Sequence, residues 1–279
     1  MRIGLIGLGN MGYPLLKKLI KNRYNVNVLI EKSNNIKLNK CNIFLESEIN
    51  KFIDCSSMII SILPNSKVTL NLAKKISNQN EKFWMDLCSS CPDDVIQISD
   101  IMSNQNISYI DAPVSGGPNG MKNGNLATII SGPIKTYKKY YDIISLYSNN
   151  IFYISENIGV SSEVKLANNT MLGLNLISVA EVLNILEKKG INIADALTFI
   201  NNSSGRSWVT MQRYPDNILN GKYNYGFSYN LHKKDILTFL NSKNIDDRFL
   251  LSKIRDIYKD KKYEISQDMD HTEITKLIK

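Results

Sequence analysis

A glycine-rich motif at the N-terminus has the spacing of a dinucleotide-binding turn. The sequence GLGNMG follows an apolar run and precedes a helical pattern. In such a turn Gly7 allows the tight bend, Gly9 lets a pyrophosphate approach the backbone, and Gly12 allows close packing of helix on strand. The N-terminus of the helix would offer N–H groups and a partial positive charge to the phosphates. The motif therefore predicts dinucleotide binding, and the turn is completed by Leu8, Asn10 and Met11.

The residue after the second apolar run bears on the choice between NAD and NADP. Glu31 follows the run at 26–30, about twenty residues beyond the glycine motif. A carboxylate at this position accepts hydrogen bonds from the ribose hydroxyls and repels a 2′-phosphate, which favours NAD. Lys32 and Lys37 could instead hold that phosphate, which would favour NADP. NAD is the expected cofactor, and NADP is the alternative.

A second motif, DAPVSGG at residues 111–117, could bind a carboxylate. It follows a predicted strand at 108–110, and α/β sheets place their ligands beyond the carboxyl ends of strands. Ser115 and the N–H groups of Gly116 and Gly117 could form an anion-binding nest. A loop without a ligand is the alternative, because further glycines lie close by in the sequence.

A lysine near the start of the longest helical pattern could transfer a proton. Lys165 and Asn169 are four residues apart in a predicted helix over 160–188, so they lie on one face of it. Their neighbours are apolar, and a lysine drawn away from water has a lowered pKa. Oxidation of an alcohol by hydride transfer needs such a group, because the hydroxyl proton must leave as the hydride departs. A surface lysine whose stem lies along apolar side chains is the alternative.

The elements that must position these residues alternate between strand and helix in the first half of the chain. Helical spacing occurs at 11–21, 68–77 and 137–146. Apolar, β-branched runs typical of strands buried on both faces occur at 2–8, 26–30, 42–45, 58–63, 83–87, 108–110, 127–131 and 151–154. This alternation predicts an α/β fold with a doubly wound, Rossmann-type parallel sheet.

Beyond residue 158 the pattern becomes helical. Residues 160–188 contain no proline and carry apolar residues on nearly all sides, which is typical of a buried helix. At about 1.5 Å per residue this helix would be roughly 40 Å long, enough to join two domains. We therefore expect an NAD(P)-binding domain over 1–158. Residues 159–279 should form a long interdomain helix and an all-α C-terminal domain for substrate binding and oligomerisation.

Composition excludes several functional classes. The 279 residues are 43% hydrophobic and 22% charged, as in globular proteins. No block of five or six basic residues accompanies the net charge of +8, so no nucleic-acid partner is expected. No run of eighteen uncharged apolar residues and no signal-peptide pattern occurs, so we expect a cytoplasmic protein that does not cross a membrane. With two histidines and one close cysteine pair, Cys88-x-x-Cys91, no metal site is expected. Cysteines in a loop are favoured over a thioredoxin-like redox pair.

The motifs GLGNMG, DAPVSGG and G-x(5)-K-x(3)-N, in this order and spacing, resemble those of the β-hydroxyacid dehydrogenase family. The resemblance implies that Lys165 is the catalytic lysine and Asn169 its orienting partner. It implies that the 115–117 segment grips the substrate carboxylate and that Lys234 lies near both the nicotinamide and the substrate. Further cofactor contacts are implied at Leu63, Pro64, Ser89 and Phe227. Two departures are the Ile30-Glu31-Lys32 sequence, which matches neither cofactor pattern of the family, and the cysteines at 88 and 91, where the family usually has Ser or Thr.

The function that this resemblance implies is an NAD(P)-dependent dehydrogenase that interconverts a short 3-hydroxy acid and its semialdehyde. The segment SSGRSW at 203–208 favours 3-hydroxyisobutyrate. Tartronate semialdehyde, succinic semialdehyde and L-serine are alternatives within the class, and a non-catalytic NAD(P)-binding scaffold is the alternative outside it. A homodimer or homotetramer is expected because the C-terminal half is small and rich in apolar helical residues. Those residues include Leu237, Phe239, Leu240, Phe249, Leu250 and Leu251.

Overall fold

The computed structural model describes residues 1–31, 40–77, 79–242, 248–260 and 269–278. Contacts within the chain divide it into two compact units, Met1–Lys165 and Leu166–Lys279. The boundary falls within the long helix α7 (Val160–Lys188), whose ends match the helix predicted over 160–188. One continuous helix therefore carries the chain from the first unit into the second.

A nine-stranded sheet is the centre of the N-terminal unit. Its strand order is β3-β2-β1-β4-β5-β6-β8-β7, with β9 beside β8. The strands are β1 (Arg2–Ile6), β2 (Asn25–Ile30), β3 (Cys41–Leu45), β4 (Met58–Ser61), β5 (Lys82–Asp86), β6 (Ile107–Asp111), β7 (Val114–Ser115), β8 (Leu126–Ser131) and β9 (Ser148–Ser155). The pairs from β3 to β6 are all parallel. The predicted Rossmann-type fold is confirmed, and each run predicted as a strand contains one.

The sheet departs from the predicted all-parallel arrangement beyond β6. β8 pairs antiparallel with β6 and β7, and only the last pair, β8 with β9, is parallel again. The chain reverses here because β7 turns back onto β8 through the short helix α5 (Gly117–Asn123). A two-residue strand has no periodicity, so its pattern could not reveal β7.

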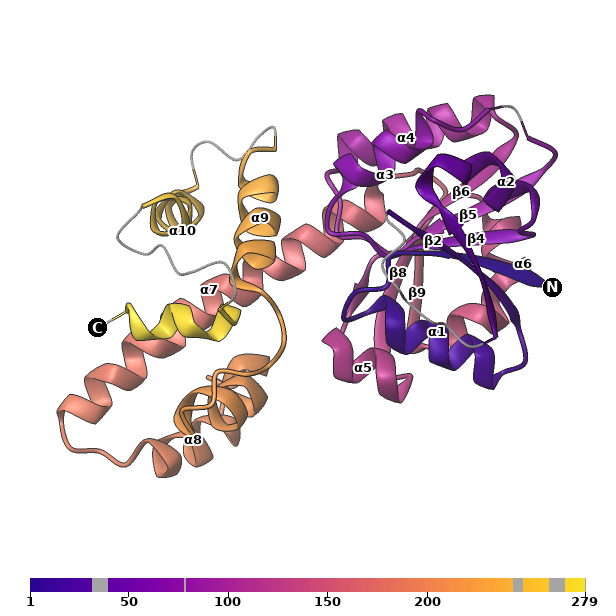
Figure 1. Ribbon diagram of the computed structural model, residues 1–279. Coiled ribbons are helices and arrows are strands. Elements are labelled where there is room, and N and C mark those ends of the chain that lie inside the picture. Colours follow the sequence, from indigo (N-terminus) through magenta and orange to yellow (C-terminus); the bar gives the residue numbers. More distant parts are fainter. Residues whose placement is uncertain (32–39, 78, 243–247, 261–268, 279) are drawn as a thin grey trace. The chain divides into compact units, whose positions relative to one another are not determined.

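Helices cover both faces of the sheet and form two apolar cores (Figure 1). One core contains side chains of α1, α5 and α6, and the other contains side chains of α2, α3 and α4. Neighbouring residues of one strand enter opposite cores: Leu5 lies in the first core and Ile6 in the second. This explains the apolar runs without alternation. The helices are α1 (Gly12–Lys21), α2 (Ile49–Asp54), α3 (Ser66–Ala73), α4 (Pro92–Asn104) and α6 (Ile134–Ser145), with a short 3-10 turn, η1 (Glu46–Glu48).

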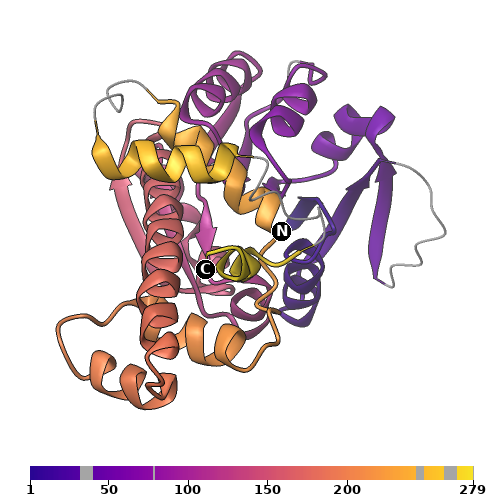
Figure 2. The same ribbon diagram turned by 90° about the vertical axis from the view of Figure 1, so that its left-hand side faces the viewer.

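The C-terminal unit is helical, as predicted. Helices pack against α7 around a core that contains Leu176, Tyr229, Ile236, Tyr258 and Ile274 (Figure 2). Besides α7, this unit contains α8 (Ile193–Asn201), the π-helical η2 (Val209–Leu219), α9 (Tyr229–Leu240), α10 (Phe249–Lys259) and η4 (His271–Lys276).

Helix α7 is buried on one side only, in contrast to the prediction of burial all round. Leu166, Leu176 and Leu183 are almost fully buried, whereas Met171 is 63% exposed and Ile185 is 54% exposed. The reason is that the helices of the C-terminal unit cover only part of the circumference of α7 within one chain. By length and hydropathy alone α7 is a candidate membrane span, but the core helix of a soluble protein passes the same test, so this is weak evidence.

Candidate functional site

The glycine-rich turn lies between β1 and α1, and the structure assigns a different constraint to each glycine. Gly7 has φ +94°, and a Cβ added to it would lie 2.1 Å from the carbonyl oxygen of Ile62. A Cβ on Gly12 would lie 1.8 Å from the carbonyl oxygen of Gly7. A Cβ on Gly9 would meet no described atom within 4 Å. The fold therefore requires Gly7 and Gly12, whereas Gly9 lies beside open space that a phosphate group can enter.

The N-terminus of α1 is suited to an anion. No side chain caps this helix end, and no acidic residue stands in its first turn. The partial positive charge of the helix end is therefore not compensated by a capping side chain or by an acid in its own first turn. Together with the open space at Gly9, this fits the pyrophosphate of a dinucleotide.

Parallel pairing brings the predicted cofactor contacts to one edge of the sheet. Glu31 follows β2, Leu63 and Pro64 follow β4, and Ser89 follows β5. Because these strands and β1 run in parallel, the segments after them share the carboxyl edge. The strand order reverses at β1, which has β2 on one side and β4 on the other, and dinucleotides bind at such a switch point. Glu31 is exposed there, whereas Lys32 and Lys37 lie outside the described residues.

Buried polar side chains hold this edge together. The Asp86 carboxylate accepts hydrogen bonds from Ser61 Oγ at 2.9 Å and from the Tyr109 hydroxyl at 3.0 Å. The sulfur of Cys88 accepts a bond from the backbone N–H of Leu63 at 3.0 Å. Burial and the nearby Asp86 raise the pKa of the Cys88 thiol well above its usual value, so it stays protonated. Cys88 is a thiol with a structural contact, and its raised pKa is the opposite of the lowered pKa of a redox thiol.

The DAPVSGG segment forms the end of β6, the short strand β7 and the start of α5. Ser115 is half-buried on β7, Gly116 is exposed with φ +128°, and Gly117 begins α5. A Cβ on Gly116 would lie 2.8 Å from a methyl carbon of Leu126. The segment is thus ordered by β-pairing and packing rather than a free loop, and it follows β6 at the same carboxyl edge as the glycine-rich turn.

The first turn of α7 is fastened to the end of β6 by Asp111. The Ser162 N–H donates to Asp111 Oδ2 at 3.0 Å, and the Ser162 hydroxyl donates to Oδ1 at 2.9 Å. The Ser161 hydroxyl lies 2.6 Å from Oδ2. Burial raises the pKa of Asp111 to about 7, although the serine hydrogen bonds act in the opposite direction. Lys165 stands one turn further along and is 8% exposed, as expected for a lysine drawn away from water.

A second polar cluster lies in the C-terminal unit around Asn169. The Asn169 side-chain N–H donates to Asp235 Oδ2 at 2.7 Å, and Lys234 Nζ lies 2.9 Å from Asp235 Oδ1. Asp235 is 1% exposed, so a buried carboxylate links the two predicted site residues. The link fixes the orientation of the Asn169 amide, because its NH₂ group must face the carboxylate.

Two histidines support the backbone of Asn169. His232 Nε2 lies 2.8 Å from the Asn169 carbonyl oxygen and must donate to it. In neutral His232 the other nitrogen, Nδ1, is then an acceptor, and His271 Nδ1 donates to it at 3.2 Å. Burial, with the charges of His232 and Arg213, lowers the pKa of His271 well below its usual value. His271 is therefore neutral, and its proton lies on the Nδ1 that donates to His232.

The predicted site residues fall into two groups. The N-terminal unit brings the glycine-rich turn, Glu31, Leu63, Pro64, Ser89 and the 115–117 segment to one sheet edge, and it ends with Lys165. The C-terminal unit contains Asn169, Lys234 and Phe227. The Phe227 ring packs against the His232 ring, with centroids 5.1 Å apart. Lys165 and Asn169 are one helical turn apart on the continuous helix α7.

Sequence reasoning missed two carboxylates that organise these groups. Asp111 is the first residue of a recognised motif, and Asp235 follows the recognised Lys234, but neither was assigned a role. Their partners lie 51 and 66 residues away in sequence. Adjacency to a motif was the only available signal, since no local pattern connects residues so far apart.

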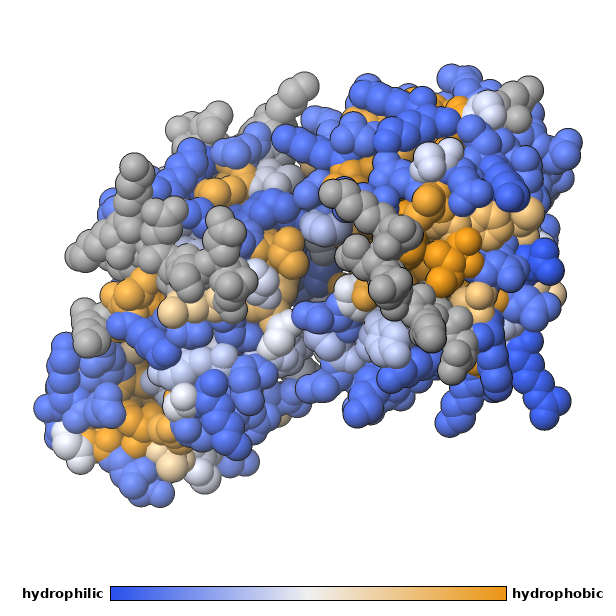
Figure 3. Space-filling model, viewed as in Figure 1, coloured by the Kyte–Doolittle hydropathy of each residue, from blue (hydrophilic) through white to orange (hydrophobic). Residues whose placement is uncertain are grey.

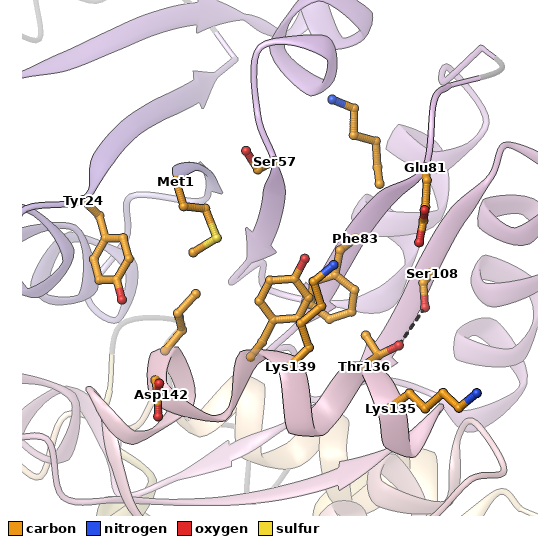
Figure 4. Close-up of a pocket in the computed structure, with 13 residues that line it drawn as sticks. Met1, Tyr24, Ser57, Glu81, Phe83, Ser108, Lys135, Thr136, Lys139 and Asp142 are labelled. Carbon is orange, nitrogen blue, oxygen red and sulfur yellow. Dashed lines mark hydrogen bonds between the residues drawn. The ribbon is translucent and has the colours of Figure 1, made fainter.

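A separate cavity lies at the opposite edge of the sheet. It has a volume of about 730 Å³ and is lined from the amino ends of the strands and by α6 (Figure 4). Side chains of both signs line it, among them Lys135, Lys139, Glu81 and Asp142. The Lys82 ammonium donates to the backbone carbonyl of Ser56 at 2.9 Å rather than standing free. Ligands of doubly wound sheets bind beyond the carboxyl ends of strands, so this cavity is not the dinucleotide site.

Two protein families match the chain and together cover almost all of it. The NAD binding domain of 6-phosphogluconate dehydrogenase matches residues 2–155, and the NAD-binding domain of NADP-dependent 3-hydroxyisobutyrate dehydrogenase matches residues 159–278. The 2-(hydroxymethyl)glutarate dehydrogenase of Eubacterium barkeri is 27% identical over 242 residues, covering 85% of this chain and 80% of the relative. The mitochondrial 3-hydroxyisobutyrate dehydrogenase of Rattus norvegicus is also 27% identical, over 84% of this chain and 73% of the relative.

Solved structures share the fold. A Mycobacterium tuberculosis 3-hydroxyisobutyrate dehydrogenase with L-serine superposes with a TM-score of 0.87 at 21% identity, covering 99% of this chain and 98% of the other. A structure described as Psf3 in complex with NADP⁺ and 2-OPP has a TM-score of 0.83 at 18% identity, covering 99% of this chain and 100% of the other. At these identities the likeness concerns the fold alone.

Proposed function

Because the chain belongs to the β-hydroxyacid dehydrogenase family, and is thus an NAD(P)-dependent oxidoreductase, we propose that it interconverts a short 3-hydroxy acid and its semialdehyde. The observation that carries the proposal is Lys165, a lysine only 8% exposed on the anchored start of α7. A buried lysine is suited to exchange a proton with a substrate hydroxyl. Asn169, one turn further along, supports it with an amide whose orientation is set by Asp235.

The glycine-rich turn and the end of β1 would hold the cofactor. NAD(P), when bound, would accept the hydride that leaves the alcohol carbon of the substrate. Gly9 leaves space for the pyrophosphate, and the uncapped N-terminus of α1 stabilises its negative charge. Leu63, Pro64 and Ser89, which follow neighbouring strands at the same edge, would line the remainder of the cofactor site.

The substrate would be held at its carboxylate while its proton moves to Lys165. Ser115 and the N–H groups of the 116–117 segment would bind the carboxylate, because they offer donors and no acidic residue stands among residues 112–118. The Lys165 amine takes the proton from the hydroxyl in the oxidative direction and returns it in the reductive direction. The Asn169 side-chain oxygen, which also accepts a hydrogen bond from Asn168 Nδ2 at 3.1 Å, faces away from Asp235 and would accept a second bond from the lysine, which would keep the amine aligned.

Cofactor preference is the second part of the proposal. Glu31 ends the β2 segment with an exposed carboxylate, which favours NAD over NADP. Among solved structures that share the fold, one is described with NADP⁺ and another, an imine reductase, with NAD⁺. Glu31→Ser should therefore relax discrimination against NADP, measured as the ratio of kcat/KM for the two cofactors. A wild-type enzyme with a strong preference for NADP would contradict this role of Glu31.

The decisive experiment combines a substrate panel with a lysine variant. The panel contains 3-hydroxyisobutyrate, L-serine, 2-(hydroxymethyl)glutarate and the reduced forms of tartronate and succinic semialdehydes, each with NAD and NADP. We expect 3-hydroxyisobutyrate to be turned over best. Lys165→Ala should lower turnover by about 10²–10⁴-fold. Lys165→Arg should not restore it, because guanidinium does not release its proton near neutral pH.

The matched control is Lys188→Ala, which removes an exposed lysine from the end of the same helix. It should leave turnover unchanged, and NADH binding should be similar in the wild type and in both alanine variants. Turnover of Lys165→Ala within about tenfold of the wild type would contradict the proposed role. No turnover of any panel substrate by the wild type would favour a cofactor-binding scaffold.

We further propose that the chain is a homodimer or homotetramer. Apolar side chains gather at the end of the C-terminal unit that carries α8 (Figure 3), where Phe199 is 75% exposed. Phe249 and Leu250 are also exposed, as the sequence suggested for an interface, whereas Leu240 lies in the core of its unit and cannot take part. Light scattering tests the oligomer, and a monomer at micromolar concentration would contradict it.

We also propose that the protein is located in the cytoplasm. Several relatives are named as mitochondrial enzymes, among them those of Rattus norvegicus and Drosophila melanogaster. Cell fractionation with antibodies against the chain distinguishes the two compartments, and recovery in an organelle fraction would contradict the proposal.

A further inference from the structure

Four buried side chains form a continuous hydrogen-bonded cluster at the start of α7. Asp111, Ser131, Ser161 and Ser162 are each at most 1% exposed. The Ser161 and Ser131 hydroxyls lie 2.7 Å apart, and the Ser161 N–H donates to Ser131 Oγ at 3.3 Å. Ser161 also reaches the backbone carbonyl of Asp111 at 2.9 Å. The paired ends of β6 and β8 therefore both hold the first turn of α7.

This cluster of Asp111, Ser131, Ser161 and Ser162, called the anchor below, differs from an ordinary helix cap. Capping side chains usually come from the residue that immediately precedes the helix. Here the accepting carboxylate comes from the end of β6, 51 residues before Ser162. The residue before α7 is Gly159, with φ +93°, which has no side chain to cap it. The position of the helix start is consequently set by the sheet rather than by the local loop.

The anchor acts on Lys165 through the helix. The Cα atoms of Ser161 and Lys165 are separated by about 6 Å along the axis, one helical turn. Helical side chains tilt toward the N-terminus, so Lys165 is directed toward the anchored turn. A carboxylate at a helix N-terminus also offsets the positive helix end, which otherwise disfavours an ammonium group nearby.

The chemistry of the anchor suggests more than a structural role. Burial raises the pKa of Asp111 to about 7, which shows that keeping a carboxylate there is costly. A neutral side chain could accept hydrogen bonds from the serines without that cost. Above this pKa, the buried acid supplies both fixed geometry and negative charge at the start of the helix.

We propose that Asp111 is a positioning residue for Lys165: through Ser161 and Ser162 it fixes the first turn of α7, and its carboxylate stabilises the lysine ammonium. This inference rests on the proposed function, in which Lys165 exchanges the proton. It assigns to the first residue of DAPVSGG a task separate from the carboxylate contact proposed for Ser115.

The first test reads Lys165 directly and requires no substrate. Trace acetylation with acetic anhydride is followed by mass spectrometry of Lys165 and Lys82 peptides at a pH above the pKa of Asp111. Lys82 is a matched control, because it is partly buried in the same unit and hydrogen-bonded to backbone carbonyls. Asp111→Asn should raise the labelling rate of Lys165 relative to Lys82 by about fivefold, from loss of a unit charge near the ammonium. An unchanged ratio would overturn the inference.

The second test is a double-mutant cycle with Lys165→Ala. Asp111→Asn should lower kcat by at least about tenfold in the wild-type background, because small displacements of a reacting group are costly. It should have little effect when Lys165 is already absent. Equal effects in both backgrounds would overturn the inference and leave a structural cap. If instead the proposed catalytic role of Lys165 is wrong, the Lys165→Ala single variant will itself keep high activity, which distinguishes the two failures.

Two further variants keep the test decisive. If Asp111→Asn does not fold, Ser162→Ala replaces it, since this change removes one hydrogen bond to Asp111 and keeps the carboxylate. Ser162→Ala should lower kcat by a smaller factor, and this effect should also disappear when Lys165 is already replaced by alanine.

Asp94→Asn is the control variant for the carboxylate, because Asp94 accepts a hydrogen bond at 2.5 Å from Ser66, the first residue of another helix. Its effect on kcat should be equal in both backgrounds, and coupling as strong as that of Asp111 would overturn the specific role.

Discussion

The glycine-rich turn offers a prediction in which stability and cofactor binding respond to different residues. A Cβ on Gly12 would lie 1.8 Å from a backbone oxygen, which cannot move without displacing the turn. Gly12→Ala should therefore lower the free energy of unfolding by about 3 kcal/mol, the upper end of typical overpacking costs. A Cβ on Gly9 meets no described atom within 4 Å, so Gly9→Ala should change stability by less than about 0.5 kcal/mol.

Cofactor affinity should show the opposite order among folded variants. A methyl group on Gly9 occupies the space through which the pyrophosphate approaches, at a cost of about 1–3 kcal/mol. This corresponds to a roughly 5–150-fold rise in the Kd of NADH. Urea unfolding and calorimetric titration with NADH and NADPH measure the two quantities on the same samples.

Gly205→Ala is the matched control for this pair. The nearest atom to its added Cβ would be a methyl carbon of Ile200 at 3.5 Å, an ordinary contact, so stability and affinity should both stay near wild-type values. The reasoning is refuted if Gly9→Ala destabilises the protein as much as Gly12→Ala, or if it binds NADH as tightly as the wild type.

Three further predictions follow from buried polar groups. The pKa of Asp111 is raised to about 7 in the folded protein, so the folded state holds an extra proton between about pH 4 and 7. Stability should fall by a few kcal/mol as pH rises through this window, and Asp111→Asn should remove that slope in urea titrations; a slope of opposite sign would contradict it. Asp270→Ala deprives the backbone N–H groups of Gly226 and Thr272 of their acceptor and should cost about 2–4 kcal/mol in urea unfolding. Asp270→Asn should lower the free energy of unfolding by less than Asp270→Ala does. Equal losses in the two variants would exclude hydrogen bonding as the cause. Cys88→Ala leaves the Leu63 N–H without its acceptor and should lower the free energy of unfolding by about 1–3 kcal/mol. Cys88→Ser should retain most of the stability and the activity, and loss of activity in this variant would indicate a redox role.

The sequence alone identified the elements whose signals are local. The strands from β1 to β6 were predictable because each is a short apolar run buried on both faces, and α7 because its 29 residues contain no helix-breaking proline. The roles of Gly7 and Gly12 were also predictable, since the positive φ of Gly7 and the close approach of Gly12 to the Gly7 carbonyl oxygen both arise within a turn of six residues. The burial of Lys165 followed from the apolar residues beside it on the same helix.

Other features depended on packing between distant segments. The reversal at β8 depends on a two-residue strand, and the exposed side of α7 depends on how much of it the neighbouring helices cover. Periodicity reports that a helix is apolar but not which of its sides is covered. It also placed Leu240 at an interface, although the structure shows that it fills the core of its own unit.

The partners of the candidate site were decided by the tertiary structure alone. Asp111 meets Ser162 across 51 residues, Asp235 meets Asn169 across 66, and His232 meets the Asn169 carbonyl across 63. The sequence supplied the lysine, the asparagine and the helix that carries them. It could not supply the carboxylates that hold them, because hydrogen bonds between such distant residues form only when strands and helices pack, and packing leaves no local pattern in the chain.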